Sequence, residues 1–108
     1  MTETTRRIID IIRSIPPGKV ASYRDAALAA GLPNGARQVA RLLHSMSKTQ
    51  KLPWHRIIRA DGHIALPAES GGDLQAALLK AEGVKVSKEM RIDMTQYSFF
   101  RPGKKTDL

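Results

Sequence analysis

A chain of 108 residues, of which 42% are hydrophobic, can form one small domain and leaves no room for a second catalytic domain. It contains no cysteine, which excludes disulfides, thiolate metal sites and thiol nucleophiles. The net charge of +8 comes from the front of the chain, because residues 1–60 carry 11 Lys or Arg and 3 Asp or Glu, whereas residues 61–108 carry 7 of each. This asymmetry favours a face that binds nucleic acid over a charged surface that only aids solubility.

The start of the chain, residues 1–7, lacks the apolar run of a signal peptide. No stretch approaches the roughly 20 apolar residues that a membrane span needs. We therefore expect no membrane partner and a cytoplasmic protein, associated with the nucleoid when it binds DNA. We also expect a monomer with neither a cofactor nor a metal ion.

Two helices are predicted at the front of the chain. One carries its apolar face on Ile8, Ile11, Ile12 and Ile15 and ends at Pro16-Pro17-Gly18. Ser22 then has the position of a helix N-cap, with Asp25 three residues later as in a capping box. The short alanine-rich helix that follows stops at Gly31.

A third helix is predicted to begin near Ala36, after the turn Leu32-Pro33-Asn34-Gly35. Its apolar positions are Val39, Leu42, Leu43 and Met46, and its exposed polar strip is Arg37, Gln38, Arg41 and Ser45. Two short helices joined by a tight turn are typical of a helix-turn-helix, whose second helix reads a DNA groove.

The second half predicts less regular structure. Ile57-Ile58 and Ile64-Ala65-Leu66 flank Asp61-Gly62, which indicates a β-hairpin. A further helix, capped by Asp73 and stopped by Gly83, should bury Leu74, Ala77, Leu78 and Ala81. Residues 84–94 show some alternation and are expected to be extended. The prediction is one mainly α domain with a small β-hairpin over residues 1–100, like a winged helix, and a polar, flexible tail over residues 101–108.

Five segments occur together in an order that is similar to a known family. They are Val20-Ala21-Ser22-Tyr23, the helix-turn-helix with Gly35-Ala36-Arg37-Gln38-Val39, Pro53-Trp54-His55-Arg56-Ile57-Ile58, Ser70-Gly71-Gly72 and Leu78-Leu79-Lys80-Ala81-Glu82-Gly83. In this order and spacing the chain resembles the DNA-binding domain of O6-alkylguanine-DNA alkyltransferases, from about residue 8 to residue 83. The family tetrapeptide Pro-Cys-His-Arg reads Pro-Trp-His-Arg here, as in the non-enzymatic, alkyltransferase-like branch.

The substitution at Trp54 has a chemical consequence of its own. Alkyl transfer to protein needs a thiolate, and an indole nitrogen is a donor without a usable nucleophilic lone pair. We therefore expect no catalytic residues. The resemblance implies that His55 and Glu82 occupy the positions of the family's catalytic partners, and we expect them to survive as a hydrogen-bonded pair that supports a pocket.

The resemblance also implies roles in base flipping. Arg37 matches the arginine that fills the gap left by the rotated nucleotide, and Tyr23 matches the tyrosine that presses on its phosphate. The expected pocket residues are Trp54, His55, Pro53, Tyr23, Glu82 and Ser70, and the expected DNA-binding residues are Arg37, Gln38, Tyr23, Arg41 and Ser45. Trp54 should stack on or abut the extruded base.

Two departures from the family pattern bear on the pocket. The family's hinge asparagine falls on Met46, so that hinge bond is lost or replaced. The segment Leu66-Pro67-Ala68-Glu69 is one residue longer than its counterpart and lacks the tyrosine that would cover the pocket. We therefore expect a wider pocket than in the alkyltransferases.

The function expected from the resemblance is binding of O6-alkylguanine in double-stranded DNA without repair, followed by handover to nucleotide excision repair proteins. Two other functions fit parts of the sequence. A winged-helix regulator would read a DNA sequence, usually as a dimer on a palindrome. A base-excision enzyme would use His55 and Glu82 as a general base and would release a product from alkylated duplex.

Overall fold

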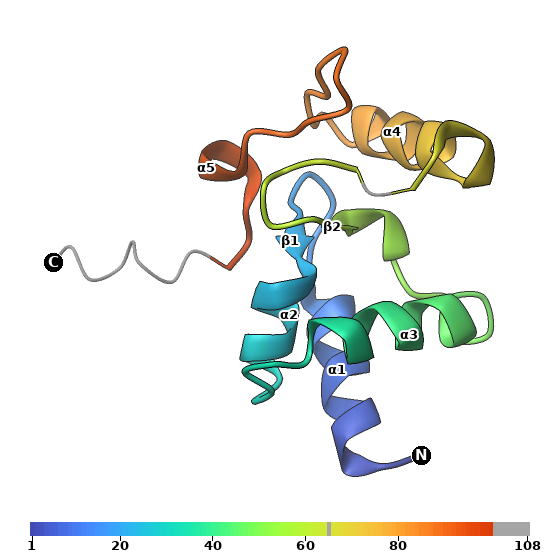
Figure 1. Ribbon diagram of the computed structural model, residues 1–108, viewed down its shortest axis with the longest axis vertical. Helices are drawn as coiled ribbons and strands as arrows, with labels where there is room; N and C mark the ends of the chain where they lie inside the picture. Colours follow the sequence, from blue (N-terminus) through green and yellow to red (C-terminus); the bar gives the residue numbers. More distant parts are fainter. Residues whose placement is uncertain (65, 101–108) are drawn as a thin grey trace, which may run out of the picture.

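The computed structural model describes residues 1–64 and 66–100, and Figure 1 shows their arrangement. Three helices (α1, α2 and α3) lie on one side of a small sheet, and α4 and α5 lie on the other side. The elements are α1 Glu3–Ser14, β1 Ala21–Ser22, α2 Tyr23–Ala29, α3 Ala36–Met46, η1 Trp54–Arg56, β2 Ile57–Ile58, η2 Ala68–Ser70, α4 Gly72–Ala81 and α5 Met94–Tyr97. No helix among the described residues is long and apolar enough to cross a membrane.

The three helices predicted for the front half are confirmed, and local capping explains their bounds. The Thr2 side chain accepts a hydrogen bond from the Thr5 N–H at the start of α1. The Ser22 hydroxyl accepts from the Asp25 N–H at 2.9 Å, which is the predicted N-cap of α2. Gly31 adopts a φ of 84°, a left-handed conformation that suits the end of a helix.

The sheet separates two hydrophobic clusters. Successive residues of a strand point to opposite faces, so Ala21 and Ile57 pack with α1–α3, whereas Val20 and Ile58 pack with α4 and the C-terminal segment. Both β2 residues are fully buried. The two strands therefore form the wall between the two clusters.

The predicted hairpin has the right turn and the wrong strand pairing. The Arg59 N–H donates to the His63 carbonyl at 3.1 Å and the Gly62 N–H donates to the Arg59 carbonyl, so the chain does turn there. However, β2 pairs in parallel with β1, with Ala21 opposite Ile57, and His63 forms an antiparallel bridge to Arg91. A strand that is apolar on both faces needs a partner inside the core, which β1 supplies.

The buried face predicted for α4 is also wrong. Gly71 precedes the helix as its cap and Asp73 lies in the first turn, while Leu74 is 55% exposed. The residues that α4 buries are Gly72, Gln75, Ala76 and Leu79. A side chain at Gly72 would collide with the Leu66 carbonyl oxygen, so the helix approaches the preceding loop through a residue without Cβ.

The segment after α4 completes the second cluster. Gly83 has a φ of 89°, consistent with the predicted stop. The expected extended structure over residues 84–94 is limited to the bridge at Arg91. Val84, Ile92 and Tyr97 are nevertheless buried, and Ser98 forms a parallel bridge with Val20. The tail predicted for residues 101–108 lies outside the described residues.

The Glu82 carboxylate ties three parts of the chain together. It accepts hydrogen bonds from His55 Nε2 at 2.7 Å, from Arg56 Nη2 at 2.7 Å and from the Gly18 N–H at 3.1 Å. Arg56 Nη1 also donates to the Ile15 carbonyl at 2.9 Å. This network joins the end of α4, the turn after α1 and η1.

Burial alone would raise the pKa of Glu82, whose side chain is 16% exposed. The hydrogen bonds from Arg56, His55 and Gly18 outweigh this effect and lower the pKa to about 2 from an ordinary 4.5. The group is therefore a carboxylate at neutral pH, and its charge contributes to the free energy of unfolding.

We expect Glu82→Gln to destabilise the protein by about 3 kcal/mol at pH 7, because it leaves the Arg56 guanidinium buried without its counter-charge. A depressed pKa contributes stability above the unfolded-state pKa and loses it as pH falls through the folded-state pKa. The stability difference between wild type and variant should therefore shrink between pH 4.5 and about 2. Denaturant melts at several pH values measure it.

Glu89→Gln is the matched control, since Glu89 is exposed and lies away from this network. It should leave the free energy of unfolding nearly unchanged at pH 7. A stability difference for Glu82→Gln that stays constant from pH 7 to pH 2 would contradict the role given to this carboxylate.

Candidate nucleic-acid interface and cavity

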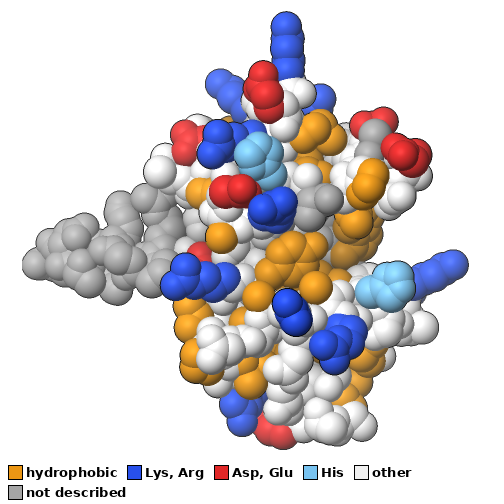
Figure 2. Space-filling view, viewed as in Figure 1, with side chains coloured by type: hydrophobic (Ala, Val, Ile, Leu, Met, Phe, Trp, Pro, Cys, Tyr) orange, Lys and Arg blue, Asp and Glu red, His pale blue; other side chains and the backbone are white. Residues whose placement is uncertain are grey.

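A cavity of about 380 Å³ lies between α3, η1 and the segment that leads into α4. Its lining includes three of the residues expected for the pocket, Tyr23, Trp54 and Ser70. Leu66 also lines it, and this residue begins the segment that the resemblance places at the pocket. The sequence did not predict the other lining residues, which are Ala40, Leu43, His44, Ser47 and Gln75. Figure 2 shows apolar side chains gathered in the middle of this view of the molecule, with Lys and Arg side chains around them.

Trp54 reaches the cavity from the first position of η1. The Trp54 N–H donates to the Leu52 carbonyl at 2.8 Å, which closes a tight turn just before the helix. Its ring packs edge-on against His55, with ring centroids 6.1 Å apart and an interplanar angle of 85°. The indole is partly exposed, so one part of it packs on the α1–α3 cluster and the rest remains available to a ligand.

Tyr23 enters the cavity from the first residue of α2, directly after the Ser22 cap. Burial raises the pKa of the Tyr23 phenol, because the phenolate would lose hydration. At neutral pH the hydroxyl is therefore protonated and can donate a hydrogen bond to an anionic oxygen such as a phosphate.

Gln75 is a buried polar residue that sequence reasoning missed. Its Nε2 donates to the His55 carbonyl at 3.1 Å and to the Ile57 carbonyl at 3.0 Å, so α4 is hydrogen-bonded to η1 and β2. Both amide hydrogens are used, which leaves the amide oxygen as an acceptor beside the cavity. The signal in the sequence was its position, because Gln75 directly follows Leu74 and so borders the apolar face expected for α4.

The remaining expected pocket residues lie elsewhere. Pro53, His55 and Glu82 are not among the described residues that line the cavity. His55 and Glu82 form the predicted hydrogen-bonded pair, at 2.7 Å. Because Trp54 and His55 are neighbours in η1, this pair lies behind the tryptophan as a support.

Helix α3 carries two neighbouring strips. Ala40, Leu43 and His44 face the cavity, whereas the exposed residues Arg37, Gln38, Arg41 and Ser45 form the polar strip predicted for DNA binding. Arg37 stands three residues before Ala40 and seven before His44, at the N-terminal end of the cavity strip. A cation there opposes the helix dipole, an unfavourable arrangement that a bound polyanion would relieve.

The polar strip borders a shallow groove of about 240 Å³ beside the start of α1. Gln38, Arg41 and Ser45 line one side, and three threonines line the other. The Ser45 hydroxyl donates to the Arg41 carbonyl at 3.1 Å, while the Gln38 amide, the Arg41 guanidinium and the threonine hydroxyls line the groove. Such groups are suited to phosphate oxygens.

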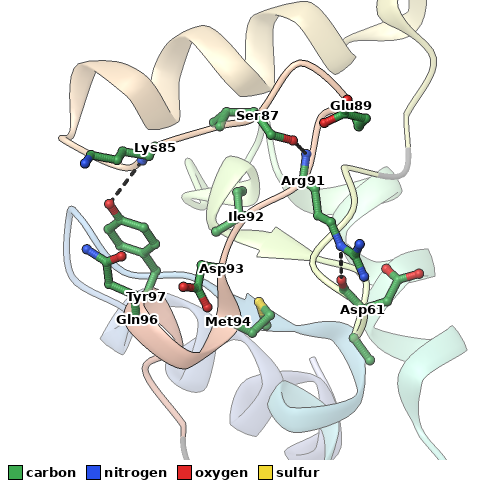
Figure 3. A pocket seen from close by; sticks show the side chains of 12 residues that line it. Asp61, Lys85, Ser87, Glu89, Arg91, Ile92, Asp93, Met94, Gln96 and Tyr97 are labelled. Carbon is green, nitrogen blue, oxygen red and sulfur yellow. Dashed lines mark hydrogen bonds between the residues drawn. The ribbon is translucent and has the colours of Figure 1, made fainter.

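A larger hollow of about 710 Å³ is formed by residues 60–61 and 85–97 (Figure 3). It shares no lining residue with the cavity beside Trp54. Its charges are mixed, and Arg91 Nε donates to the backbone carbonyl of Asp61 at 3.3 Å. In the described part of the chain, no group of three or more His, Cys, Asp or Glu could hold a metal ion.

Comparison with known proteins agrees with this geometry. Residues 3–84 match the family model described as the DNA-binding domain of 6-O-methylguanine DNA methyltransferase. The chain is 42% identical over 94 residues to a DNA base-flipping protein of Escherichia coli, covering 85% of this chain and 70% of that protein. It is 31% identical over 102 residues to alkyltransferase-like protein 1 of Schizosaccharomyces pombe, covering 90% of this chain and 94% of that protein.

The fold is also similar to that of a solved complex. The crystal structure of S. pombe Atl1 with damaged DNA containing O6-carboxymethylguanine superposes with a TM-score of 0.83 at 29% identity, covering 94% of this chain and 98% of that one. The helix-turn-helix, the cavity lined by Trp54 and the sequence matches all indicate the same family. The chain belongs to the family of the 6-O-methylguanine DNA methyltransferase DNA-binding domain.

Proposed function

We propose that this protein binds O6-alkylguanine in double-stranded DNA by rotating the damaged nucleotide out of the helix into the cavity beside Trp54. The observation that carries the proposal is the position of that cavity, since α3 contributes residues both to its wall and to the exposed polar strip. A helix that lies in a DNA groove would thus present the cavity to the same duplex. The relatives named for base flipping and for binding damaged DNA add support.

Selectivity for damaged bases depends on two opposing free energies, that of extruding a base from the duplex and that of stacking it on Trp54. Extruding a base costs a few kcal/mol, and the cost is lower for a mispaired, damaged base. Stacking on an aromatic side chain returns about 1–3 kcal/mol in proteins that bind single strands. Since the two terms nearly cancel, the cheaper extrusion of the lesion decides which base stays in the cavity.

Arg37 and Tyr23 have the positions to promote rotation. Arg37 is exposed at the end of the cavity strip, where its guanidinium can occupy the gap in the base stack. Tyr23 keeps its proton and can donate to the phosphate of the rotating nucleotide. Gln38, Arg41 and Ser45 would contact the backbone beside them and fix the register of α3.

The bound lesion is not repaired in this proposal. The chain has no cysteine, and the indole of Trp54 cannot accept an alkyl group. Glu82 is held as a carboxylate by Arg56 and His55 behind the tryptophan. We further propose that binding flags the lesion for nucleotide excision repair proteins. The support for that step is the resemblance to the non-enzymatic branch and the fact that binding alone removes no damage.

A duplex with one O6-methylguanine should compete better for the protein than its undamaged twin, because only extrusion of the lesion is cheap enough. Competition titration followed by mass analysis of both components measures this. The recovered DNA and protein should be chemically unchanged. Methylation of the protein, or release of the free base, would show that the protein is an enzyme and would contradict binding without repair.

Arg37→Ala should weaken flipping while leaving the thermal midpoint nearly unchanged, because Arg37 is exposed and outside the core. Tyr23→Phe should do the same through loss of one hydroxyl. A fluorescent base beside the lesion reports the extrusion. Arg91→Ala, which removes an exposed arginine beside the larger hollow, is the control and should keep the wild-type signal. An unchanged reporter signal in Arg37→Ala would show that Arg37 has no part in flipping the base.

Bulky O6 adducts should bind at least as tightly as methyl, since Trp54 and Leu66 give the cavity apolar walls. An added benzyl-sized group gains on the order of 1–2 kcal/mol if it buries its area against them. Trp54→Ala should narrow the gap between the two adducts. Dissociation constants on duplexes that differ only at O6 test this, and a clear preference for methyl would show that the indole fills the space itself.

A further inference from the structure

The hydroxyl of Ser47 is the one buried side-chain oxygen or nitrogen in the described part of the chain that has no hydrogen-bond partner there. Ser47 is the C-cap of α3, and its backbone N–H donates to the Leu43 carbonyl at 3.1 Å. The residue also lines the cavity beside Trp54. An unsatisfied polar group therefore lies at the wall of the site proposed for the damaged base.

Other serines near helix ends of this protein satisfy their hydroxyls locally. Ser14 donates to the Ile11 carbonyl at the end of α1, and Ser45 donates to the Arg41 carbonyl. This back-bonding to the preceding turn is the usual behaviour of serine in helices. Ser47 departs from it although a buried hydroxyl without a partner destabilises a folded protein. A ligand in the cavity could supply the missing partner.

The wall around Ser47 is chemically divided. Leu43, Leu66 and Trp54 are apolar. His44 stands on the same strip of α3, and Gln75 keeps a free amide oxygen after donating to two carbonyls. A guest that is apolar at one end and polar at the other would match both parts of this lining.

We propose that Ser47 is a specificity-determining residue of the cavity, which favours O6 substituents that carry a hydroxyl or carbonyl group over purely alkyl substituents of the same size. In the free protein its oxygen is buried, and rotation about the Cα–Cβ bond can turn it to the cavity side when a guest there offers a hydrogen-bond partner. A serine hydroxyl both donates and accepts, so it can pair with either kind of group. This inference rests on the proposed function, since it concerns the adduct that the cavity holds.

Two duplexes that differ only at O6 test the proposal, one with O6-propylguanine and one with O6-(2-hydroxyethyl)guanine. Their substituents have the same number of non-hydrogen atoms and differ by one oxygen. Dissociation constants are measured for wild type and Ser47→Ala. The ratio of the two constants should shift about 5-fold toward propyl in the variant, the worth of one ordinary hydrogen bond.

The free proteins provide a second, independent readout. Ser47→Ala removes the unsatisfied hydroxyl, so its thermal midpoint without DNA should rise by about 4–8 °C. Ser14→Ala is the matched control, because it removes a hydroxyl that is partnered at the end of another helix. It should bring no such rise and should leave the ratio of dissociation constants at the wild-type value.

The outcomes separate this inference from the proposed function. If both adducts bind more tightly than unmodified duplex but Ser47→Ala leaves their ratio unchanged, Ser47 does not determine specificity and lesion binding stands. If neither adduct binds more tightly than unmodified duplex, lesion binding fails and this inference fails with it. A lower midpoint for Ser47→Ala would show that its hydroxyl has a partner in solution, which would overturn the reason for the proposal.

Discussion

The Glu82 carboxylate accepts hydrogen bonds from segments that are far apart in the sequence, and the position of Trp54 depends on them. Two of the donors, His55 and Arg56, belong to the same three-residue helix as the tryptophan. The contacts that neutralise the carboxylate therefore also hold the backbone from which the indole projects. Buried ion pairs add little net stability compared with apolar packing, and their better-supported role is to specify one arrangement. Here that arrangement places the indole at the cavity wall.

The elements that could be predicted are those with signals inside a few neighbouring residues. The apolar face of α1, the Ser22 cap and the glycine at position 31 each act locally. The cap and the glycine appear as predicted, and the face of α1 differs only in that Ile9 is buried and Ile11 is partly buried. Pairing between β1 and β2 depends on contacts across more than thirty residues, so the turn at Gly62 was identified and the partner strand was not. α5 is a single turn capped by Asp93, too short for periodicity to show.

The cavity was predictable only in part, for a related reason. Tyr23, Trp54 and Ser70 were expected there through motifs of the family, and the structure brings them together. His44, Ser47 and Gln75 carry no motif, and they reach the cavity because of the direction in which a helix presents them. Gln75 also violates the rule that a polar side chain faces solvent, since two carbonyls satisfy its amide. Only the packed structure reveals such compensation.

The bridge between Val20 and Ser98 joins the residue before β1 to the end of the described chain. Synthesis proceeds from the N-terminus, and domains begin to fold as they emerge from the ribosome. The α1–α3 cluster depends on residues up to Ile57, apart from a late contact with Phe100, whereas the second cluster must wait for Ile92 and Tyr97. Contacts between distant residues also form slowly. In a growing chain, all residues of the cationic helix-turn-helix are therefore synthesised before those of α4 and of the cavity wall that Ser70 and Gln75 complete. The groups suited to a DNA backbone thus precede, in order of synthesis, the groups that complete the cavity for a single base.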